Sequence, residues 1–286
     1  YVLPNSNADS QNVVRGQIFR TVDGTNLNVS NFESLLFSSN DTYTIGLADL
    51  VNNDAVLNGN EITLTKGVFT ENPIHVSEVL EVDGIKIGYL MYNQFNNDFD
   101  NQLNAVFADF AANGVQELVL DLRYNLGGSV NTAIYLSSMI TGQFTGELYL
   151  KQRLNDKLNE AFDEESLKRF FVNQFLDGTS INSLNLNNVY ILAQESSASA
   201  SELLINSLSA TPYLDNNLVH IGNTTRGKNE FSTLLVDVPG CGFVSSSQCN
   251  EPINPNHTYG MLPLIGRNEN ADGFFEFTAS FTNVYH

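Results

Sequence analysis

Residues 121–128 read Asp-Leu-Arg-Tyr-Asn-Leu-Gly-Gly and overlap the end of an apolar, strand-like run at 118–122. The carboxyl ends of strands are where α/β sheets bind ligands. Two adjacent glycines, Gly127 and Gly128, let the backbone approach a substrate closely, and free N–H groups at the start of a helix can stabilise an oxyanion. The same glycines would also suit a tight strand-to-helix turn with no chemical role, so this segment alone leaves both interpretations open.

A second segment, residues 197–202, reads Ser-Ala-Ser-Ala-Ser-Glu and lies between a predicted strand and a predicted helix. Its small residues leave room for a substrate, and a serine hydroxyl at an exposed helix start can act as a nucleophile. Ser199 and Glu202 also have the Ser-x-x-Glu spacing of a capping box, which would be a purely structural helix start. The segment alone favours neither interpretation.

The third segment is Gly227-Lys228, in the loop after a predicted strand at 218–222. Most lysines are solvated surface charges, which is the simpler interpretation. None of the four histidines lies in a motif typical of a Ser/His/Asp triad, so lysine is the remaining base for a serine. The ordinary lysine pKa of about 10.4 would have to fall to about 7, a change worth roughly 4 kcal/mol, which burial can impose. The net charge of −19 opposes this change, but exposed charges are screened beyond about 8 Å, so desolvation should dominate if Lys228 is buried.

These segments need a scaffold that brings several strand ends together. Four apolar runs predict buried strands, at residues 86–92, 118–122, 189–193 and 218–222. Apolar residues at helical spacing predict three helices, at residues 98–112, 130–140 and 201–208. Such alternation indicates an α/β fold with a largely parallel sheet.

The first third of the chain has a different pattern. Alternation over 16–22, an Asp23-Gly24 turn and a hairpin signal at Asn58-Gly59 predict a small β-rich module. The alternation of apolar and polar residues is interrupted near Asn72-Pro73, and a different spacing of apolar residues begins at Val82. We therefore place the domain boundary between residues 81 and 82. Within the second domain, residues 151–178 are polar with one apolar face at helical spacing, which predicts an inserted helical arm.

Together and in this order, the three segments resemble the motifs of the C-terminal processing (tail-specific) serine peptidases. In that family a strand ending in Asp-Leu-Arg-x-Asn-x-Gly-Gly precedes Ser-Ala-Ser-Ala-Ser-Glu and then Gly-Lys. The resemblance covers residues 82 to about 283 and implies a crotonase-like (ClpP/crotonase) spiral core that uses no metal and no cofactor. By position it also implies that Ser199 is the nucleophile and Lys228 the general base, with an oxyanion hole formed by the N–H groups of Ala200 and of Gly127 or Gly128.

Residues 2–24 resemble the later part of a PDZ domain, which implies that residues 1–81 form a partial, N-terminally truncated PDZ-like domain. The chain departs from the peptidase family after the lysine, where a glycine and a glutamine are common and this sequence has Asn229 and Ser232. An acid often found late in the helix after the nucleophile is replaced near Ala210. These departures bear on how the base is oriented, whereas the Ser/Lys pair itself is intact.

Charge and hydropathy exclude several classes of partner. With 13 basic and 32 acidic residues, the surface repels phosphate backbones and anionic lipids, so we expect no nucleic-acid partner. The apolar runs fall far short of the roughly 20 residues of a membrane helix, so we expect no integral membrane protein. Polypeptide substrates are the expected partners, and the oligomeric state stays open.

Cys241 and Cys249 lie in one Gly/Ser-rich stretch without a metal-binding motif. We favour a local disulfide, which would place the chain outside the reducing cytosol. The alternative is a pair of free thiols in a cytosolic protein. The chain begins at Tyr1 rather than methionine, so we expect that a leader or a larger N-terminal piece has been removed, and a periplasmic or extracellular location with an upstream lipid anchor as an option.

The sequence as a whole predicts a serine endopeptidase that uses a Ser199/Lys228 dyad to cleave polypeptides near their C-termini. The altered residues after Lys228 keep a second hypothesis open, a non-catalytic peptide- or ligand-binding protein on the same scaffold. A third hypothesis, a crotonase-type acyl-CoA enzyme, would share the fold but gives no reason for a Ser/Lys pair.

Overall fold

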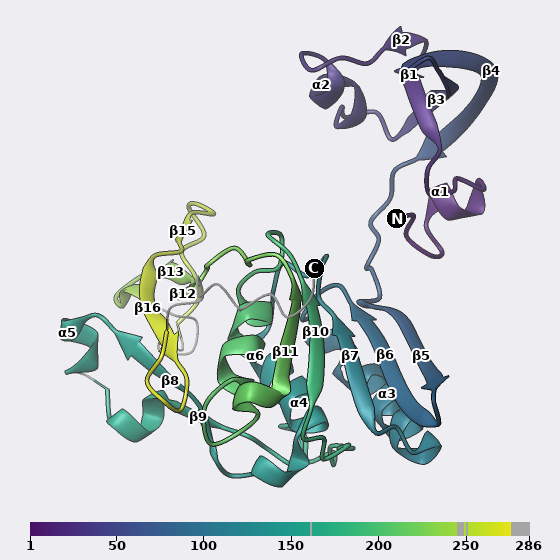
Figure 1. Cartoon of the computed structure of the whole chain (residues 1–286). Helices are drawn as coiled ribbons and strands as arrows, with labels where there is room; N and C mark the ends of the chain where they lie inside the picture. The colour runs from purple at the N-terminus through teal and green to yellow at the C-terminus, as the bar shows by residue number, and fades with distance from the viewer. Residues whose placement is uncertain (161, 245–248, 250, 276–286) are drawn as a thin grey trace. The chain divides into compact units, whose positions relative to one another are not determined.

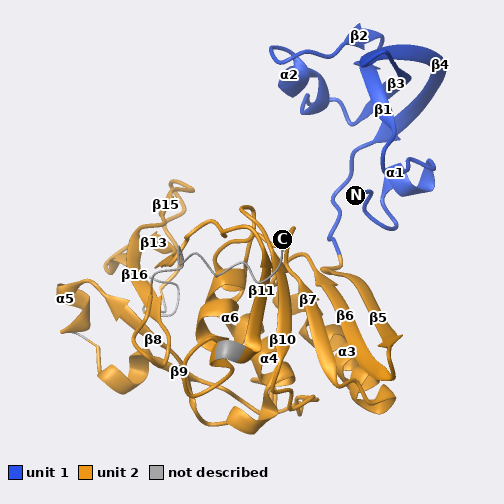
Figure 2. Cartoon of the chain, viewed as in Figure 1, with its two compact units in different colours: residues 1–71 blue, residues 72–286 orange. Residues whose placement is uncertain are grey.

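The chain divides into two compact units, Tyr1–Glu71 and Asn72–His286 (Figure 1; Figure 2). The computed structural model describes residues 1–160, 162–244, 249 and 251–275. The second unit begins at Asn72, ahead of the boundary expected between residues 81 and 82. The reason is strand β5 (Ile74–Val82), which pairs antiparallel with β6 (Ile85–Tyr92) along its whole length and so belongs to the larger unit.

Unit 1 is β-rich, as the sequence predicts. Its four strands are β1 (Ile18–Val22), β2 (Thr25–Asn26), β3 (Thr42–Val51) and β4 (Asp54–Thr65), in the antiparallel order β2-β1-β3-β4. Two short helices, α1 (Asn7–Ser10) and α2 (Phe32–Leu36), complete the unit. Val22, Ile45 and Leu47 form its buried core.

The long hairpin of unit 1 turns at a different place from the one predicted. The β3–β4 turn is made by Asn52 and Asn53, both with positive φ (50° and 67°), as a tight hairpin turn requires. Asn58 and Gly59 lie inside β4, where the pairing register shifts. Asparagine, like glycine, is common at turn positions with positive φ. The sequence alone therefore does not show whether the hairpin turns at Asn52-Asn53 or at Asn58-Gly59.

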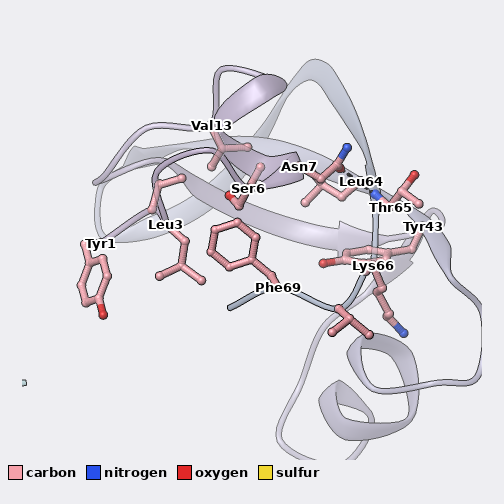
Figure 3. Close-up of a pocket in the computed structure, with 14 residues that line it drawn as sticks. Tyr1, Leu3, Ser6, Asn7, Val13, Tyr43, Leu64, Thr65, Lys66 and Phe69 are labelled. Atoms are coloured by element: carbon pink, nitrogen blue, oxygen red, sulfur yellow. Dashed lines mark hydrogen bonds between the residues drawn. The ribbon is translucent and has the colours of Figure 1, made fainter. Parts of the chain in front are cut away.

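A groove of about 540 Å³ lies within unit 1, between the N-terminal segment and the chain that leaves β4 (Figure 3). Its lining is mainly apolar and includes Leu3, Val13, Tyr43, Leu64 and Phe69.

The central sheet of unit 2 is largely parallel, as predicted. Its order is β11-β10-β7-β6-β5, in which β7 spans Glu117–Asp121, β10 spans Val189–Ala193 and β11 spans Leu218–Gly222 (Figure 1). All neighbours pair in parallel except β5 and β6. Because Asp121 pairs with Leu192, and Ala193 with Gly222, the three loops that follow β7, β10 and β11 leave the same edge of the sheet.

Three helices pack with this sheet around one apolar core. They are α3 (Asp100–Asn113), α4 (Val130–Ile140) and α6 (Ala200–Leu208), close to the predicted ranges. Gly114 ends α3 at φ 70°, and the Ser129 hydroxyl caps α4 by accepting the Thr132 N–H at 3.2 Å. Leu90, Leu118, Leu120, Phe107 and Leu136 are fully buried in the core.

Residues 151–178 do not form the predicted helical arm. This stretch contains the end of β8 (Leu148–Leu154), the short helix α5 (Asp156–Asn159) and β9 (Lys168–Phe170). With β12 (Glu230–Ser232) and β16 (Leu264–Glu269), the strands make a second sheet in the order β12-β16-β8-β9. The prediction failed because β8 is held by β16, more than a hundred residues later in the sequence, and local periodicity carries no sign of that pairing.

A third sheet follows β12 and comprises β13 (Leu235–Val238), β14 (Gly242–Val244) and β15 (Gly260–Met261). The predicted disulfide joins Cys241, between β13 and β14, to Cys249. Four short 3₁₀ segments complete the described chain, at Asn97–Phe99, Gly142–Phe144, Glu164–Leu167 and Asp215–Asn217. Among the described residues, no helix has the length and apolarity needed to cross a bilayer.

Candidate active site

Ser199 stands at the N-terminus of α6, directly after the loop that leaves β10. Its backbone has φ 56° and ψ −111°, a conformation that non-glycine residues rarely adopt and that often marks functional sites. Ser199 and Glu202 form the capping box that the sequence indicated, with the Ser199 N–H donating to Glu202 Oε2 at 2.8 Å. The structural interpretation of this segment is therefore confirmed, and it leaves the Ser199 hydroxyl proton uncommitted.

The neighbouring serines use their hydroxyls to fasten the Ser199 loop to the Asp121 segment. Ser196 donates to the Arg123 carbonyl at 2.6 Å, and Ser197 donates to the Leu122 carbonyl at 2.8 Å. Ser201 donates to the Asn125 carbonyl at 3.1 Å. Ser199 donates to no residue in the described part of the chain, so of these four serines it alone has a hydroxyl proton available for chemistry.

The two glycines of the first segment are packed against different neighbours. Gly127 has φ 104°, and a Cβ placed on it would come within 2.7 Å of the Ser199 Cβ and 2.9 Å of the Ala200 nitrogen. Gly128 has φ 140°, and its Cβ would collide with the Phe95 carbonyl oxygen. Only glycine fits at either position, at Gly127 because of the Ser199 loop and at Gly128 because of Phe95.

Asn125 decides which glycine N–H is available to a substrate. Its Oδ1 accepts the Gly127 N–H at 2.8 Å, and its Nδ2 donates to the Tyr92 carbonyl at 2.9 Å. The Gly128 N–H and the Ala200 N–H have no acceptor among the described residues. Both can therefore donate to an oxyanion, and the sequence alone left the choice between Gly127 and Gly128 open.

Asn125 itself was not expected to matter, although it lies in the first motif. It is completely buried, and its carbonyl accepts the Ala198 N–H at 3.1 Å as well as the Ser201 hydroxyl. A buried side chain with both amide groups satisfied is a rigid link between two loops. Asparagine is common in turns, so its type gave no signal for this role.

Asp121 and Arg123 brace the start of the same loop. Asp121 is buried, accepts the Tyr89 hydroxyl at 2.8 Å and pairs with Arg123 at 2.6 Å. Burial alone would raise the pKa of Asp121, but the hydrogen bonds from Arg123 and Tyr89 outweigh it and hold the pKa below its ordinary value. Burial, and then the bond to Asp121, raises the pKa of Tyr89.

Glu202 connects the serine to the lysine. It is 2% exposed, and its Oε2 accepts the Ser199 N–H at 2.8 Å and the Lys228 N–H at 2.9 Å. Its Oε1 accepts the Gly227 N–H at 2.5 Å. These three bonds thus hold the Gly227-Lys228 backbone beside that of Ser199, a role that the sequence did not reveal beyond the capping-box spacing.

The side chain of Lys228 does not meet the expectation of burial. It is exposed, and it forms no ion pair with any described residue. The desolvation that would favour a neutral amine is therefore absent from this conformation. The structure brings together the backbones of Ser199, Lys228, Ala200, Gly127 and Gly128, and it leaves the lysine head group in solvent.

The departures from the peptidase pattern fall at the edge of this site. Asn229 donates from Nδ2 to the Phe275 carbonyl at 2.8 Å, and its own carbonyl accepts the Asn268 N–H at 3.3 Å. Ser232 is half-buried on β12. Asn229 therefore ties the loop of Lys228 to the segment after β16, and a glycine at this position could not make the side-chain bond.

The profile of Peptidase family S41 matches residues 86–244, which contain all three segments. A "Probable CtpA-like serine protease" of Staphylococcus aureus (strain N315) is 27% identical over 135 residues, 47% of this chain and 24% of that protein. The like-named protein of Staphylococcus haemolyticus (strain JCSC1435) is 29% identical over 130 residues, 46% of this chain and 23% of that protein. The chain thus spans about a quarter of the length of the curated relatives it matches.

Two solved structures share the mixed α/β fold. A Bacteroides fragilis NCTC 9343 protein described as an S41 protease superposes with a TM-score of 0.75 at 26% identity, over 100% of this chain and 69% of that one. A photosystem II D1 C-terminal processing protease superposes with a TM-score of 0.52 at 19% identity, over 98% of this chain and 66% of that one.

Proposed function

The chain belongs to peptidase family S41, and we propose that it is a serine endopeptidase in which Ser199 is the nucleophile and Lys228 the general base. The observation that carries this proposal is that the backbone N–H groups of Ser199 and Lys228 both donate to the Glu202 carboxylate. The relatives named for serine proteases support the reaction class.

The proposed reaction begins at a substrate carbonyl seated over the Gly128 and Ala200 N–H groups. Neutral Lys228 takes the hydroxyl proton of Ser199 while Oγ attacks the carbonyl carbon, and the two N–H groups stabilise the resulting oxyanion. The protonated lysine then gives its proton to the leaving amine as the peptide C–N bond breaks. Water, deprotonated by Lys228, hydrolyses the acyl-enzyme and restores the Ser199 hydroxyl.

The exposure of Lys228 adds one requirement to this proposal. A solvated ammonium cannot accept a proton, so a bound polypeptide must cover the lysine and remove its water. Substrate binding and activation of the base are then the same event. The exposed lysine in the free protein would be the resting form of a peptidase that works only on a substrate long enough to cover it.

Cleavage near the C-terminus of the substrate is the expected specificity, supported by the fold shared with a D1 C-terminal processing protease. The core architecture we propose is crotonase-like. The groove of unit 1, lined by Leu3, Val13 and Phe69, supports a peptide-binding role for the proposed partial PDZ-like domain. The Cys241–Cys249 disulfide supports a periplasmic or extracellular location.

Cleavage of an unfolded protein tests the proposal directly. The chain and its Ser199→Ala variant are incubated with reduced, carboxymethylated casein, and the fragments are identified by mass spectrometry. We expect fragments from the unmodified chain and none from the variant. Equal fragmentation by both proteins would contradict the assignment of Ser199.

A non-catalytic binding protein is the second candidate, and the solvent-exposed Lys228 favours it. That candidate predicts that the folded chain binds unfolded protein but never cleaves it, at any substrate length or pH from 6 to 10.

A further inference from the structure

A recess of about 480 Å³ lies between the start of α3, the start of α4 and the turn at residues 175–178. Its lining includes Asn97, Asp100, Ser129, Tyr135, Phe175 and Asp177. Ser129 directly follows Gly128, whose N–H is one of the two proposed oxyanion donors. The recess therefore adjoins the candidate active site through the chain itself.

The recess continues the row of loops along one edge of the central sheet. In the order β10-β7-β6, Ser199 follows β10, Gly127-Gly128 follow β7, and residues 97–100 follow β6. Phe95 joins the last two loops, since its N–H donates to the Gly127 carbonyl at 3.0 Å and its carbonyl accepts the Ser129 N–H at 2.8 Å. A polypeptide with a carbonyl in the oxyanion hole would therefore bring neighbouring side chains to the recess.

Asp100 gives the first sign of a ligand in the recess. It is 9% exposed, its Oδ1 is buried without a hydrogen-bond partner, and it forms no ion pair in the described part of the chain. Burial raises the pKa of Asp100 to about 6, so the carboxyl group is largely ionised at neutral pH. Buried carboxylates are normally paired or hydrogen-bonded, because an uncompensated buried charge is strongly destabilising. An unpaired one at this position indicates a missing partner.

The charge of the lining selects a cation as that partner. Asp177 supplies a second carboxylate, and the Thr179 N–H, which donates to its Oδ1 at 2.8 Å, holds its pKa below the ordinary value. The nearby charge of Asp98 adds to that of Asp100, and the lining contains no Lys, Arg or His. Among the described residues, no group of three or more His, Cys, Asp or Glu side chains is placed to hold a metal ion, which favours an organic cation.

An aromatic wall gives a second, independent sign of the kind of ligand. Tyr135 on α4 and Phe175 have ring centroids 4.7 Å apart, and each is 7% exposed. Aromatic rings pack against methylene groups and attract a cation near their faces. Lysine and arginine combine an apolar stem with a positive head group, so their side chains match both the aromatic wall and the carboxylates.

The walls of the recess are tied together, so the site is largely preformed. Asn104 on α3 donates from Nδ2 to the Ser180 carbonyl at 2.9 Å, and its Oδ1 accepts the Asn182 N–H at 2.8 Å. These bonds hold the segment that carries Phe175 and Asp177 against α3. A preformed site loses less conformational entropy when a ligand binds.

We propose that this recess binds the side chain of a lysine or arginine of the polypeptide substrate, close to the bond that is cut. Asp100 makes the ion pair, Tyr135 and Phe175 contact the alkyl stem, and Asp177 adds to the attraction for the positive head group. This proposal rests on the proposed peptidase function and deepens it, because a basic side chain held beside the glycine pair would select which peptide bond reaches Ser199.

Binding measurements with the inactive Ser199→Ala variant test the proposal without requiring cleavage. Fluorescent alanine-based peptides carry a single lysine at successive positions, and a matched series carries norleucine, which keeps the alkyl stem but lacks the charge. Fluorescence anisotropy gives Kd for each peptide. At one position we expect lysine to bind at least about tenfold more tightly than norleucine, as hydrogen bonds to charged groups commonly allow.

The same peptides are then measured with Asp100→Asn and with Asp109→Asn, both in the Ser199→Ala background. Asp109 is an exposed acid on the same helix, so its change removes an equal charge outside the recess. Asp100→Asn should abolish the preference for lysine, and Asp109→Asn should keep it. Thermal unfolding checks that both variants fold.

Equal Kd values for lysine and norleucine at every position, or a preference that survives Asp100→Asn, would overturn the proposal. A lysine preference of the same size at every position would show attraction by the net negative charge alone, and would overturn it too. A preference that calcium chloride removes and sodium chloride of equal ionic strength does not would assign the recess to a metal ion instead. A preference that requires Asp100, in a chain that never cleaves protein, would uphold the recess and refute only the peptidase function.

Discussion

The backbone N–H groups of Ser199 and Lys228 donate to the same carboxylate oxygen, Glu202 Oε2, at 2.8 and 2.9 Å. The two nitrogens therefore lie no farther apart than the sum of these distances, although 29 residues separate them in the sequence. One buried side chain thus holds the backbones of the proposed nucleophile and the proposed base close together, whatever the position of the lysine head group.

Replacing Glu202 by glutamine should lower kcat by about 10- to 100-fold with little change in KM. The amide loses one of the acceptor oxygens and the charge that hold Gly227 and Lys228, so the dyad is misaligned while the substrate surface is intact. Steady-state kinetics on a peptide substrate measure kcat and KM separately for each variant. Glu78→Gln, an exposed acid on β5 away from the three segments, is the control for kcat. Full activity of Glu202→Gln would show that the charged hydrogen bonds from Ser199, Gly227 and Lys228 to Glu202 are not needed for activity.

Gly127→Ala should abolish activity, because the new Cβ would meet the Ser199 Cβ at 2.7 Å. The matched control is Gly146→Ala, where φ is also positive (89°) but no atom lies within 4 Å of the added Cβ. Both changes strain the backbone by about 1 kcal/mol, so only the collision distinguishes them. If the two variants had equal activity, the tight contact between the glycine turn and the serine would not be needed for function.

Asn125→Ala should reduce the free energy of unfolding by about 2–4 kcal/mol. The change leaves the Gly127 N–H and the Tyr92 carbonyl without their partners in a fully buried position, and each unsatisfied group costs about 1–3 kcal/mol. Urea denaturation followed by circular dichroism measures the free energy of unfolding of both proteins. A loss below about 0.5 kcal/mol would mean that water or a shifted backbone replaces the amide.

Asp100→Asn should stabilise the protein at pH 7.5 and give no benefit at pH 3.5. Burial raises the pKa of Asp100 to about 6; the nearby Thr132 hydroxyl opposes this shift, and the charge of Asp98 adds to it. Its Oδ1 is buried without a hydrogen-bond partner. Because the folded-state pKa lies above the unfolded value near 3.8, ionisation favours unfolding as pH rises from about 4 to 6 and remains unfavourable above that range.

We expect a gain of about 1–3 kcal/mol at pH 7.5 from removing that ionisation. Denaturation curves of both proteins at the two pH values provide the comparison. Asp109→Asn, an exposed acid on the same helix α3, is the control. A gain of equal size at both pH values would show that packing, rather than charge, is responsible.

Local patterns predicted those parts of the fold that are held by near neighbours. The strands β10 and β11 and the helix α4 lie at the residues that apolar periodicity indicated, because each buries a regular face in one core. Strand β8 was mistaken for part of a helix because its partner β16 is remote in sequence. The local sequence of a strand does not identify a partner that lies more than a hundred residues away.

The candidate site could be proposed from the sequence to the extent that its motifs are contiguous. Ser199, Ala200 and the glycine pair follow from two short segments, and the structure adds that Asn125 occupies one of the two glycine N–H groups. The role of Glu202 toward Lys228 could not be read from the capping-box spacing, because it depends on how the loop after β11 folds back. The exposure of Lys228 could not be predicted from the sequence either, because the burial of a side chain depends on all the segments that surround it in the fold.

The most direct test of the account is kcat/KM for one long peptide substrate, measured for the unmodified chain, Lys228→Ala, Ser199→Ala and the control Lys157→Ala. A general base typically contributes 10²- to 10⁴-fold. The account predicts that Lys228→Ala and Ser199→Ala each lose at least about 1000-fold while Lys157→Ala is unchanged. Cleavage by Lys228→Ala within about tenfold of the unmodified chain would contradict the Ser199/Lys228 dyad.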